Sequence, residues 1–289
     1  MKANALRATI AFLLVNAAVT ICTAQQPPAE TLLDLRSRGI DSYKAQQFDE
    51  AIDAFSRALA LKPDDAPTNN NLGVTLAALG RNREAIEFLE RAVKLEPEFA
   101  EALCSLGTQY YNIREWNKAI EFLQRAVRLK PDYVLALNNL GSAYLETNNH
   151  REAISLFERV VRLRPGHPEA LWTLAVAFAR EGNYDAAIKH LREAIQLKPD
   201  YFEAHNNLGV AYYHRQKYKE AVDSFERAIG LNSKYEDAIY NLGVLSIQRK
   251  HRADALAQYG KLKTLNPELA NELYRGLYKG MILSLRNKN

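Results

Sequence analysis

The chain repeats itself every 34 residues without an insertion, and this period constrains its fold more than any other feature. Glycine recurs at one position of the repeat, alanine at a second and proline at a third, with a single exception each for glycine and proline. The positions are Gly39, Gly73, Gly107, Gly141, Ala175, Gly209 and Gly243; Ala51, Ala85, Ala119, Ala153, Ala187, Ala221 and Ala255; and Pro63, Pro97, Pro131, Pro165, Pro199, Ser233 and Pro267. A fixed period of roughly 20 to 50 residues is typical of a solenoid, in which each unit packs on its neighbours.

Seven units fit this period, and each contains two amphipathic segments. The units are 32–65, 66–99, 100–133, 134–167, 168–201, 202–235 and 236–269. In the fourth unit, apolar residues recur at helical spacing in two runs, 136–144 and 153–161. Gly80, Asn148 and Gly182 stand between the two runs of their units, where they accept the left-handed backbone at a helix end. The sequence therefore predicts an all-α protein built from helix-turn-helix units.

The recurrent small residues have a steric explanation. Where two helices cross closely, there is room for glycine or alanine but not for a branched side chain. Enlarging Gly141 or Ala153 is therefore expected to overpack the crossing, at a cost of about 1–3 kcal/mol.

The glycine, alanine, aromatic and proline positions together resemble the tetratricopeptide repeat over residues 32–269. The resemblance implies a right-handed superhelical solenoid in which the first helix of each unit lines a concave groove. Terminal units of such arrays are atypical because one side faces water. Leu269, Leu273 and Leu277 accordingly predict a capping helix, with residues 270–289 forming that helix and a short tail.

Asparagine is frequent at the sixth position of the units, which the resemblance places in the groove. The residues there are Ser37, Asn71, Ser105, Asn139, Thr173, Asn207 and Asn241. A carboxamide offers both a donor and an acceptor, so the four asparagines are candidates for holding the backbone of an extended ligand. The row is similar to that in the repeat domain of the O-linked N-acetylglucosamine transferases. The alternative is that each asparagine bonds its own helix or its neighbour.

Other groove positions become more apolar toward the C-terminus. Trp172, Tyr213, Tyr240 and Val244 are candidates for gripping an extended or helical segment of a partner. The alternative is that these side chains only pack between adjacent helices.

The N-terminus is typical of an address for export. Residues 1–24 combine a basic start (Lys2, Arg7), an apolar stretch and small residues at a cleavage position, as in a signal peptide. Residues 25–31 form a proline-bearing linker. We expect an exported protein, periplasmic or secreted. An uncleaved membrane anchor and lipidation at Cys22 are the alternatives, and only these would bring membrane contact.

The charge pattern argues against nucleic acid as a ligand. The formal charge is +4, and it falls to +2 once Lys2 and Arg7 are removed with the signal. This is too little for a protein whose affinity depends on neutralising phosphates. The six histidines form no metal motif, no phosphate-binding loop occurs, and Cys104 has no basic neighbour that would activate it. The sequence thus predicts no catalytic residue, no metal and no cofactor.

The leading hypothesis is a non-catalytic scaffold that binds a polypeptide partner in its groove. Two alternatives remain at this point: a self-assembling structural repeat protein, and an accessory subunit of a glycosyltransferase-like, protein-modifying enzyme.

Overall fold

The computed structural model describes residues 30–279 and 283–286, so the expected signal (1–24) and most of the expected linker lie outside the described residues. Within the described part, every regular element is an α-helix, fifteen in all, and none is long and apolar enough to cross a membrane. The chain divides into two compact units, one up to Pro97 and one from Glu98 onward. Each is considered by itself below.

The helices come in pairs joined by short turns. The N-terminal unit contains α2 (Leu32–Lys44), α3 (Phe48–Leu61), α4 (Ala66–Ala78) and α5 (Asn82–Leu95). The C-terminal unit contains α6 (Ala100–Asn112), α7 (Trp116–Leu129), α8 (Val134–Glu146), α9 (His150–Leu163), α10 (Pro168–Glu181), α11 (Tyr184–Leu197), α12 (Phe202–His214), α13 (Tyr218–Leu231), α14 (Glu236–Gln248), α15 (Arg252–Leu265) and α16 (Pro267–Lys279). The described fold is therefore an all-α solenoid of seven helix pairs and a capping helix.

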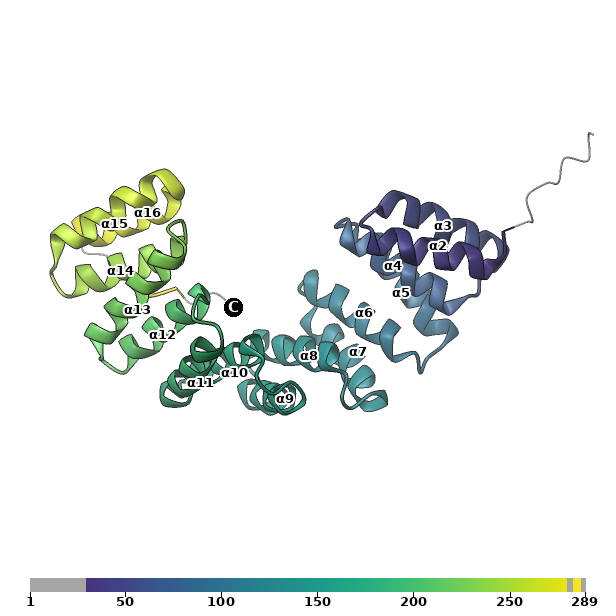
Figure 1. Ribbon diagram of the computed structural model, residues 1–289, viewed down its shortest axis with the longest axis horizontal. Coiled ribbons are helices and arrows are strands. Elements are labelled where there is room, and N and C mark those ends of the chain that lie inside the picture. Colours follow the sequence, from purple (N-terminus) through teal and green to yellow (C-terminus); the bar gives the residue numbers. More distant parts are fainter. Residues whose placement is uncertain (1–29, 280–282, 287–289) are drawn as a thin grey trace, which may run out of the picture. The chain divides into compact units, whose positions relative to one another are not determined.

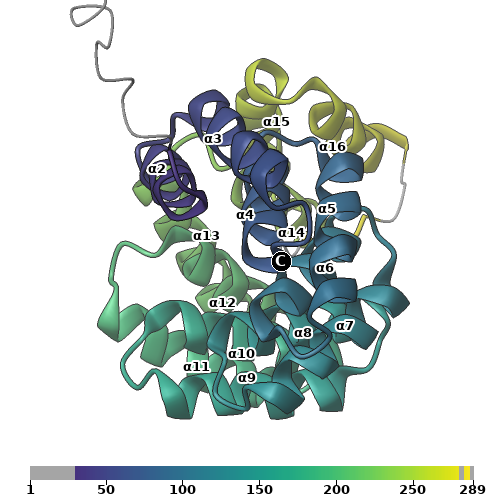
Figure 2. The ribbon, with the colours of Figure 1, turned by 90° about the vertical axis from the view of Figure 1, so that its right-hand side faces the viewer.

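In the C-terminal unit, the first helices of successive pairs lie next to one another. Helix α6 contacts α8, α10 contacts α12, and α12 contacts α14, while α8 and α10 line a shared pocket. Each second helix packs between two first helices, as α11 does between α10 and α12 (Figure 1). One face of this unit is consequently made by α6, α8, α10, α12 and α14, and we call it the first-helix face. Helix α16 packs beside α15 and against α14 at the C-terminal end of the array (Figure 2).

The repeated glycine lies where the two helices of a pair cross. A Cβ atom on Gly141 would lie 2.7 Å from the ring of Phe157 on the second helix. Ala153, the small residue of that helix, is fully buried. The expected steric cause of the period is thus confirmed: the Phe157 ring fills the space that a side chain at 141 would need.

The turns within the pairs share a left-handed residue. Gly80, Asn148 and Gly182 adopt positive φ, as expected. The same repeat position is left-handed in the other four pairs, although the residues are Gln46, Arg114, Gln216 and Lys250. The turn geometry therefore imposes this conformation even on residues for which it is unfavourable.

The second helices end at the same place with or without proline. Helix α9 ends at Leu163, two residues before Pro165, and α13 ends at Leu231 although Ser233 replaces the proline. Helix α16 begins at Pro267, three residues before the boundary expected at 270. Proline is well placed there because its fixed φ suits the first turn of a helix and the missing N–H is not needed.

Candidate polypeptide-binding surface

The residues expected to bind a ligand lie on the first helices of their pairs. Asn139, Trp172, Asn207, Tyr213, Asn241, Tyr240 and Val244 belong to the first-helix face, on α8, α10, α12 and α14. Asn71 lies on α4 in the N-terminal unit.

Asn241 is the centre of a buried hydrogen-bonded cluster. Its side-chain Nδ2 donates to Oδ1 of Asn206 at 2.9 Å and to the backbone carbonyl of Arg286 at 2.7 Å. Its Oδ1 accepts the backbone N–H of Arg286 at 2.6 Å. Both amide hydrogens of Asn241 are therefore used, and its oxygen is paired as well. One carboxamide thus holds the N–H and the C=O of a single residue in a non-helical segment of the same chain.

Asn207 keeps an unused donor beside this cluster. Its Oδ1 receives a long hydrogen bond of 3.4 Å from Nδ2 of Asn206. Its own Nδ2 is buried without a hydrogen-bond partner among the described residues. A buried polar group without a partner is costly, and such groups are rare in folded proteins. Asn207 therefore has an unused donor, although its side chain, 5% exposed, has little open surface.

The other two asparagines differ from this pair. Asn139 is half-buried and donates to Oγ1 of Thr108 on the neighbouring α6 at 2.7 Å, which matches the alternative that these asparagines bond between units. Asn71 is also half-buried, and the described residues provide no hydrogen-bond partner for its side chain.

Trp172 and Tyr213 are half-buried aromatic residues on the first-helix face. The Trp172 ring lies 6.0 Å from that of Tyr201, and its Nε1 is buried without a partner among the described residues. The Tyr213 ring lies 6.0 Å from that of Tyr218. Both residues pack between helices and also retain exposed surface. Packing between adjacent helices is therefore compatible with contact to a partner segment.

Tyr240 and Val244 need a correction, because neither offers a free surface. Tyr240 is 0% exposed and Val244 is 1% exposed, and both belong to a core cluster with Leu273 of α16. The Tyr240 hydroxyl donates to Glu272 at 2.5 Å. Burial and this neighbouring carboxylate raise the pKa of Tyr240 above its ordinary value, so the hydroxyl stays protonated. The capping helix α16 and Leu283 of the C-terminal tail belong to the same cluster as these two residues, and Leu285 packs against it, so helix and tail together cover the surface that was expected to be open.

Three parts of the site were not among the residues predicted to bind a ligand. Asn206 bridges Asn207 and Asn241, Asp237 lies 3.6 Å from the Arg286 guanidinium, and residues 283–286 themselves lie on the site. The consecutive asparagines at 206 and 207 were a usable signal, because two carboxamides side by side can form a network. Nothing in the sequence indicated where the tail lies.

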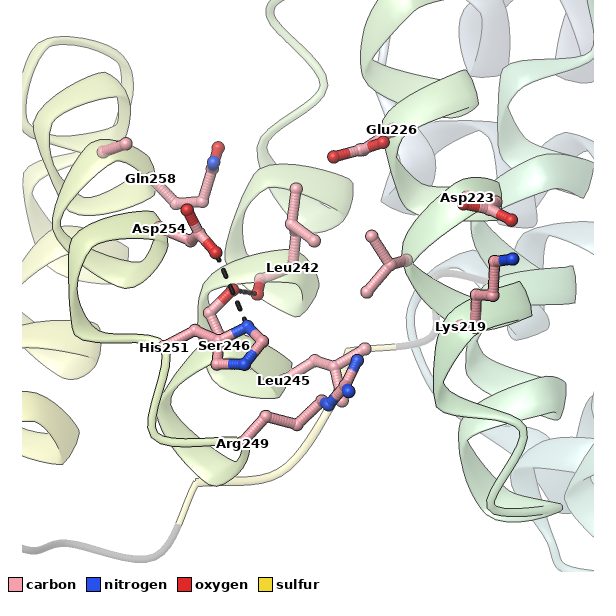
Figure 3. Close-up of a pocket in the computed structure, with 12 residues that line it drawn as sticks. Lys219, Asp223, Glu226, Leu242, Leu245, Ser246, Arg249, His251, Asp254 and Gln258 are labelled. Atoms are coloured by element: carbon pink, nitrogen blue, oxygen red, sulfur yellow. Dashed lines mark hydrogen bonds and ion pairs between the residues drawn. The ribbon is translucent and has the colours of Figure 1, made fainter.

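The pocket shown in Figure 3 lies elsewhere, between α13, α14 and α15, and has a volume of about 260 Å³. Its lining includes Asp223, Arg249 and His251, whose Nδ1 lies 3.6 Å from the carboxylate of Asp254. None of the expected binding residues lines it. A second pocket, of about 220 Å³, reaches Asn138 and Thr173 between α8 and α10.

The described residues contain no group of three His, Cys, Asp or Glu side chains that could hold a metal ion. Cys104 is buried, and burial raises the pKa of its thiol to about 11. The thiol is therefore protonated at neutral pH and a poor nucleophile.

Stacked helix pairs with a polar row on their first helices define a class, the α-helical repeat solenoids. Comparison with protein families narrows this class. Models described as tetratricopeptide repeat match residues 42–106, 98–166, 138–202 and 173–236. The chain belongs to the tetratricopeptide repeat family.

Solved structures agree with this assignment, whereas no curated protein matches the chain. A crystal structure of MamA protein is 31% identical, with a TM-score of 0.53, and the match covers 59% of this chain and 93% of that one. A tetratricopeptide repeat protein from Parabacteroides merdae is 19% identical, with a TM-score of 0.67, over 84% of this chain and 97% of its own. YrrB, described as a TPR protein with an unusual peptide-binding site, is 21% identical, with a TM-score of 0.58, over 70% of this chain and 100% of its own.

Proposed function

We propose that this protein is a non-catalytic scaffold that binds an extended segment of another polypeptide on its first-helix face, around Asn207 and Asn241. One observation carries the proposal. Asn241 binds both the N–H and the C=O of Arg286, which is how a carboxamide captures the backbone of a peptide. The unpaired Nδ2 of Asn207 and the half-buried Tyr213 extend the site along α12. YrrB, a structural neighbour, is described as having a peptide-binding site.

Protein is a better ligand for this site than nucleic acid. The charge balance of +2 without Lys2 and Arg7 supplies little attraction for phosphates. Asp237 on α14, which lies beside the Arg286 guanidinium, is acidic and would repel a phosphate.

Site-specific photocrosslinking in the native host tests the proposal. The residue p-benzoylphenylalanine would replace Tyr213 on α12. As a matched control, it would replace the exposed Lys189 on α11, a second helix that is not part of the first-helix face. We expect a crosslinked partner from position 213 and none from position 189. Equal crosslinking from both positions would contradict the proposed site. A product containing two copies of this chain would instead support self-assembly, and co-purifying transferase activity would support an accessory subunit.

We further propose that the protein is exported and that residues 1–24 are removed. The support is the basic and then apolar pattern of that segment. N-terminal sequencing of the protein from its host is expected to start at Gln25. A chain that keeps residues 1–24 and sediments with membranes would favour the anchored alternative.

A further inference from the structure

Residues Leu283–Arg286 lie on the first-helix face as an irregular segment. Its side chains alternate between more buried and more exposed positions. Leu283 is buried, Ser284 is exposed, Leu285 is half-buried and Arg286 is largely exposed. Alternation of this kind is typical of an extended chain lying on a surface. Its backbone is fixed at Arg286 by the Asn241 carboxamide.

Each side chain of the segment that points inward has a place in the protein. Leu283 occupies space beside Gly276 on α16 that a Cβ atom on Gly276 would fill. Glycine inside a helix is destabilising by about 0.5–1 kcal/mol relative to alanine. The space that Leu283 needs explains why residue 276 is glycine despite this cost. Leu285 packs against two core clusters, one containing Val244 and one containing Val210.

The side chain of Arg286 also lies beside groups that attract a guanidinium. The Arg286 guanidinium lies 3.6 Å from the carboxylate of Asp237 and 5.9 Å from the centre of the Tyr240 ring. An acidic group and an aromatic face are the two surfaces that attract a guanidinium. Nearly half of the Arg286 side chain remains exposed, at 47%, so this contact is open to exchange.

We infer that Leu283–Arg286 is an intramolecular ligand that occupies the binding site of the free protein. The site would then recognise an extended segment in which two apolar residues are separated by one residue and a basic residue follows the second of them. The inference rests on the proposed function, because it takes the same surface as the partner site. The partner segment must displace the chain's own tail in order to bind.

A tethered segment competes more strongly than its few contacts suggest. A segment held close to its site by a short tether has an effective concentration there in roughly the millimolar range. The affinity measured for a partner falls in proportion to the fraction of molecules whose site is free. Weakening the contacts between Leu283–Arg286 and the site is therefore expected to raise the apparent affinity for an external peptide by about tenfold or more.

The test measures binding of a fluorescent peptide of residues 281–289 by anisotropy. Three full-length proteins are compared: wild type; a tail variant carrying Leu283→Ser, Leu285→Ser and Arg286→Ser; and the tail variant with Asn241→Ala added. We expect the tail variant to bind at least about tenfold more tightly than wild type, and the Asn241→Ala variant to lose most of this binding. A control peptide with serine at the same three positions is expected not to bind.

Circular dichroism establishes whether the variants fold. If the triple substitution unfolds the protein, the single substitution Arg286→Glu replaces it, because nearly half of that side chain is exposed. An unchanged or weaker affinity in a folded tail variant would overturn the inference. If crosslinking from position 213 still captures a partner in that case, only the tail's role fails. If crosslinking fails as well, the proposed function fails with it.

Discussion

Gly141 and Phe157 are sixteen residues apart, and the ring of Phe157 occupies the space directly against the Cα of Gly141, at 2.7 Å from where a Cβ would stand. In the fifth unit the corresponding residues are Ala175 and Leu191, which pack in one core cluster. In the second and third units, leucine lies opposite glycine (Gly73–Leu89 and Gly107–Leu123), so the fifth unit is the one in which leucine lies opposite alanine.

This pairing makes a stability prediction. Gly141→Ala is expected to lower the free energy of unfolding by about 1–3 kcal/mol, because the new methyl group collides with the Phe157 ring. Adding Phe157→Leu reproduces the natural Ala175–Leu191 pair and should recover part of the loss. Urea denaturation measures both. Additive losses in the double variant would contradict the steric explanation.

The left-handed turn residues make a second prediction. Gln216 has φ near +59°, where a side chain costs about 1–2 kcal/mol, so Gln216→Gly is expected to stabilise the protein by a sizeable part of that amount. Gly182→Ala is the matched control, because φ is +86° there and a Cβ would meet no neighbour within 4 Å. It should destabilise through backbone strain alone. Thermal melts that shift both variants in the same direction would refute this interpretation.

The asparagines are expected to differ in their contribution to stability. Asn241→Ala leaves the buried Oδ1 of Asn206 and the backbone of Arg286 without their partner, so it should cost about 1–3 kcal/mol. Asn71→Ala removes a half-buried side chain without a described partner and should change stability by less than about 0.5 kcal/mol. Chemical denaturation compares the two. Equal losses would mean that the Asn241 bonds contribute nothing in solution.

Cys104 is expected to react slowly in the folded protein. A thiol with a pKa of about 11 holds roughly a hundredfold less thiolate at pH 8 than one with the ordinary value of 9.0. Because the folded pKa is raised, the stabilisation from the neutral thiol is fully present below pH 9 and is lost as the pH rises toward 11. A Cys22→Ser variant isolates this thiol for titration with a disulfide reagent, with and without urea. Fast labelling of the native protein would contradict its burial.

Acid is expected to weaken the fold through His190. Its ring stacks on Phe178 at 5.6 Å, and burial lowers its pKa below the ordinary 6.5 despite the nearby Glu193. The neutral form is therefore favoured by folding, so this stabilisation is present above pH 6.5 and is lost as the pH falls below it. His190→Phe keeps the stacking and removes the charge. It should show a smaller drop in urea midpoint between pH 7.5 and 5.5 than wild type shows.

Helix pairing and the small-residue crossings were predictable because they depend on contacts that recur in every unit. The pairing of residue 141 with 157 repeats as 39 with 55 and as 209 with 225, so the period itself reports it. The left-handed turns at Gln46 and Arg114 were not predicted, because their residue types give no signal and only the neighbouring helices impose the conformation.

The sequence by itself determined the repeat, the helix pairs and the row of asparagines, since each follows from a local pattern repeated along the chain. Only the tertiary structure decided which of those asparagines are free and which surface is covered. Arg286 meets Asn241 across 45 residues, and α16 and Leu283 together bury Tyr240. A segment of four residues is too short for its local pattern to predict where it lies, and its position depends on the shape and polar groups of a surface that exists only after the helices have packed.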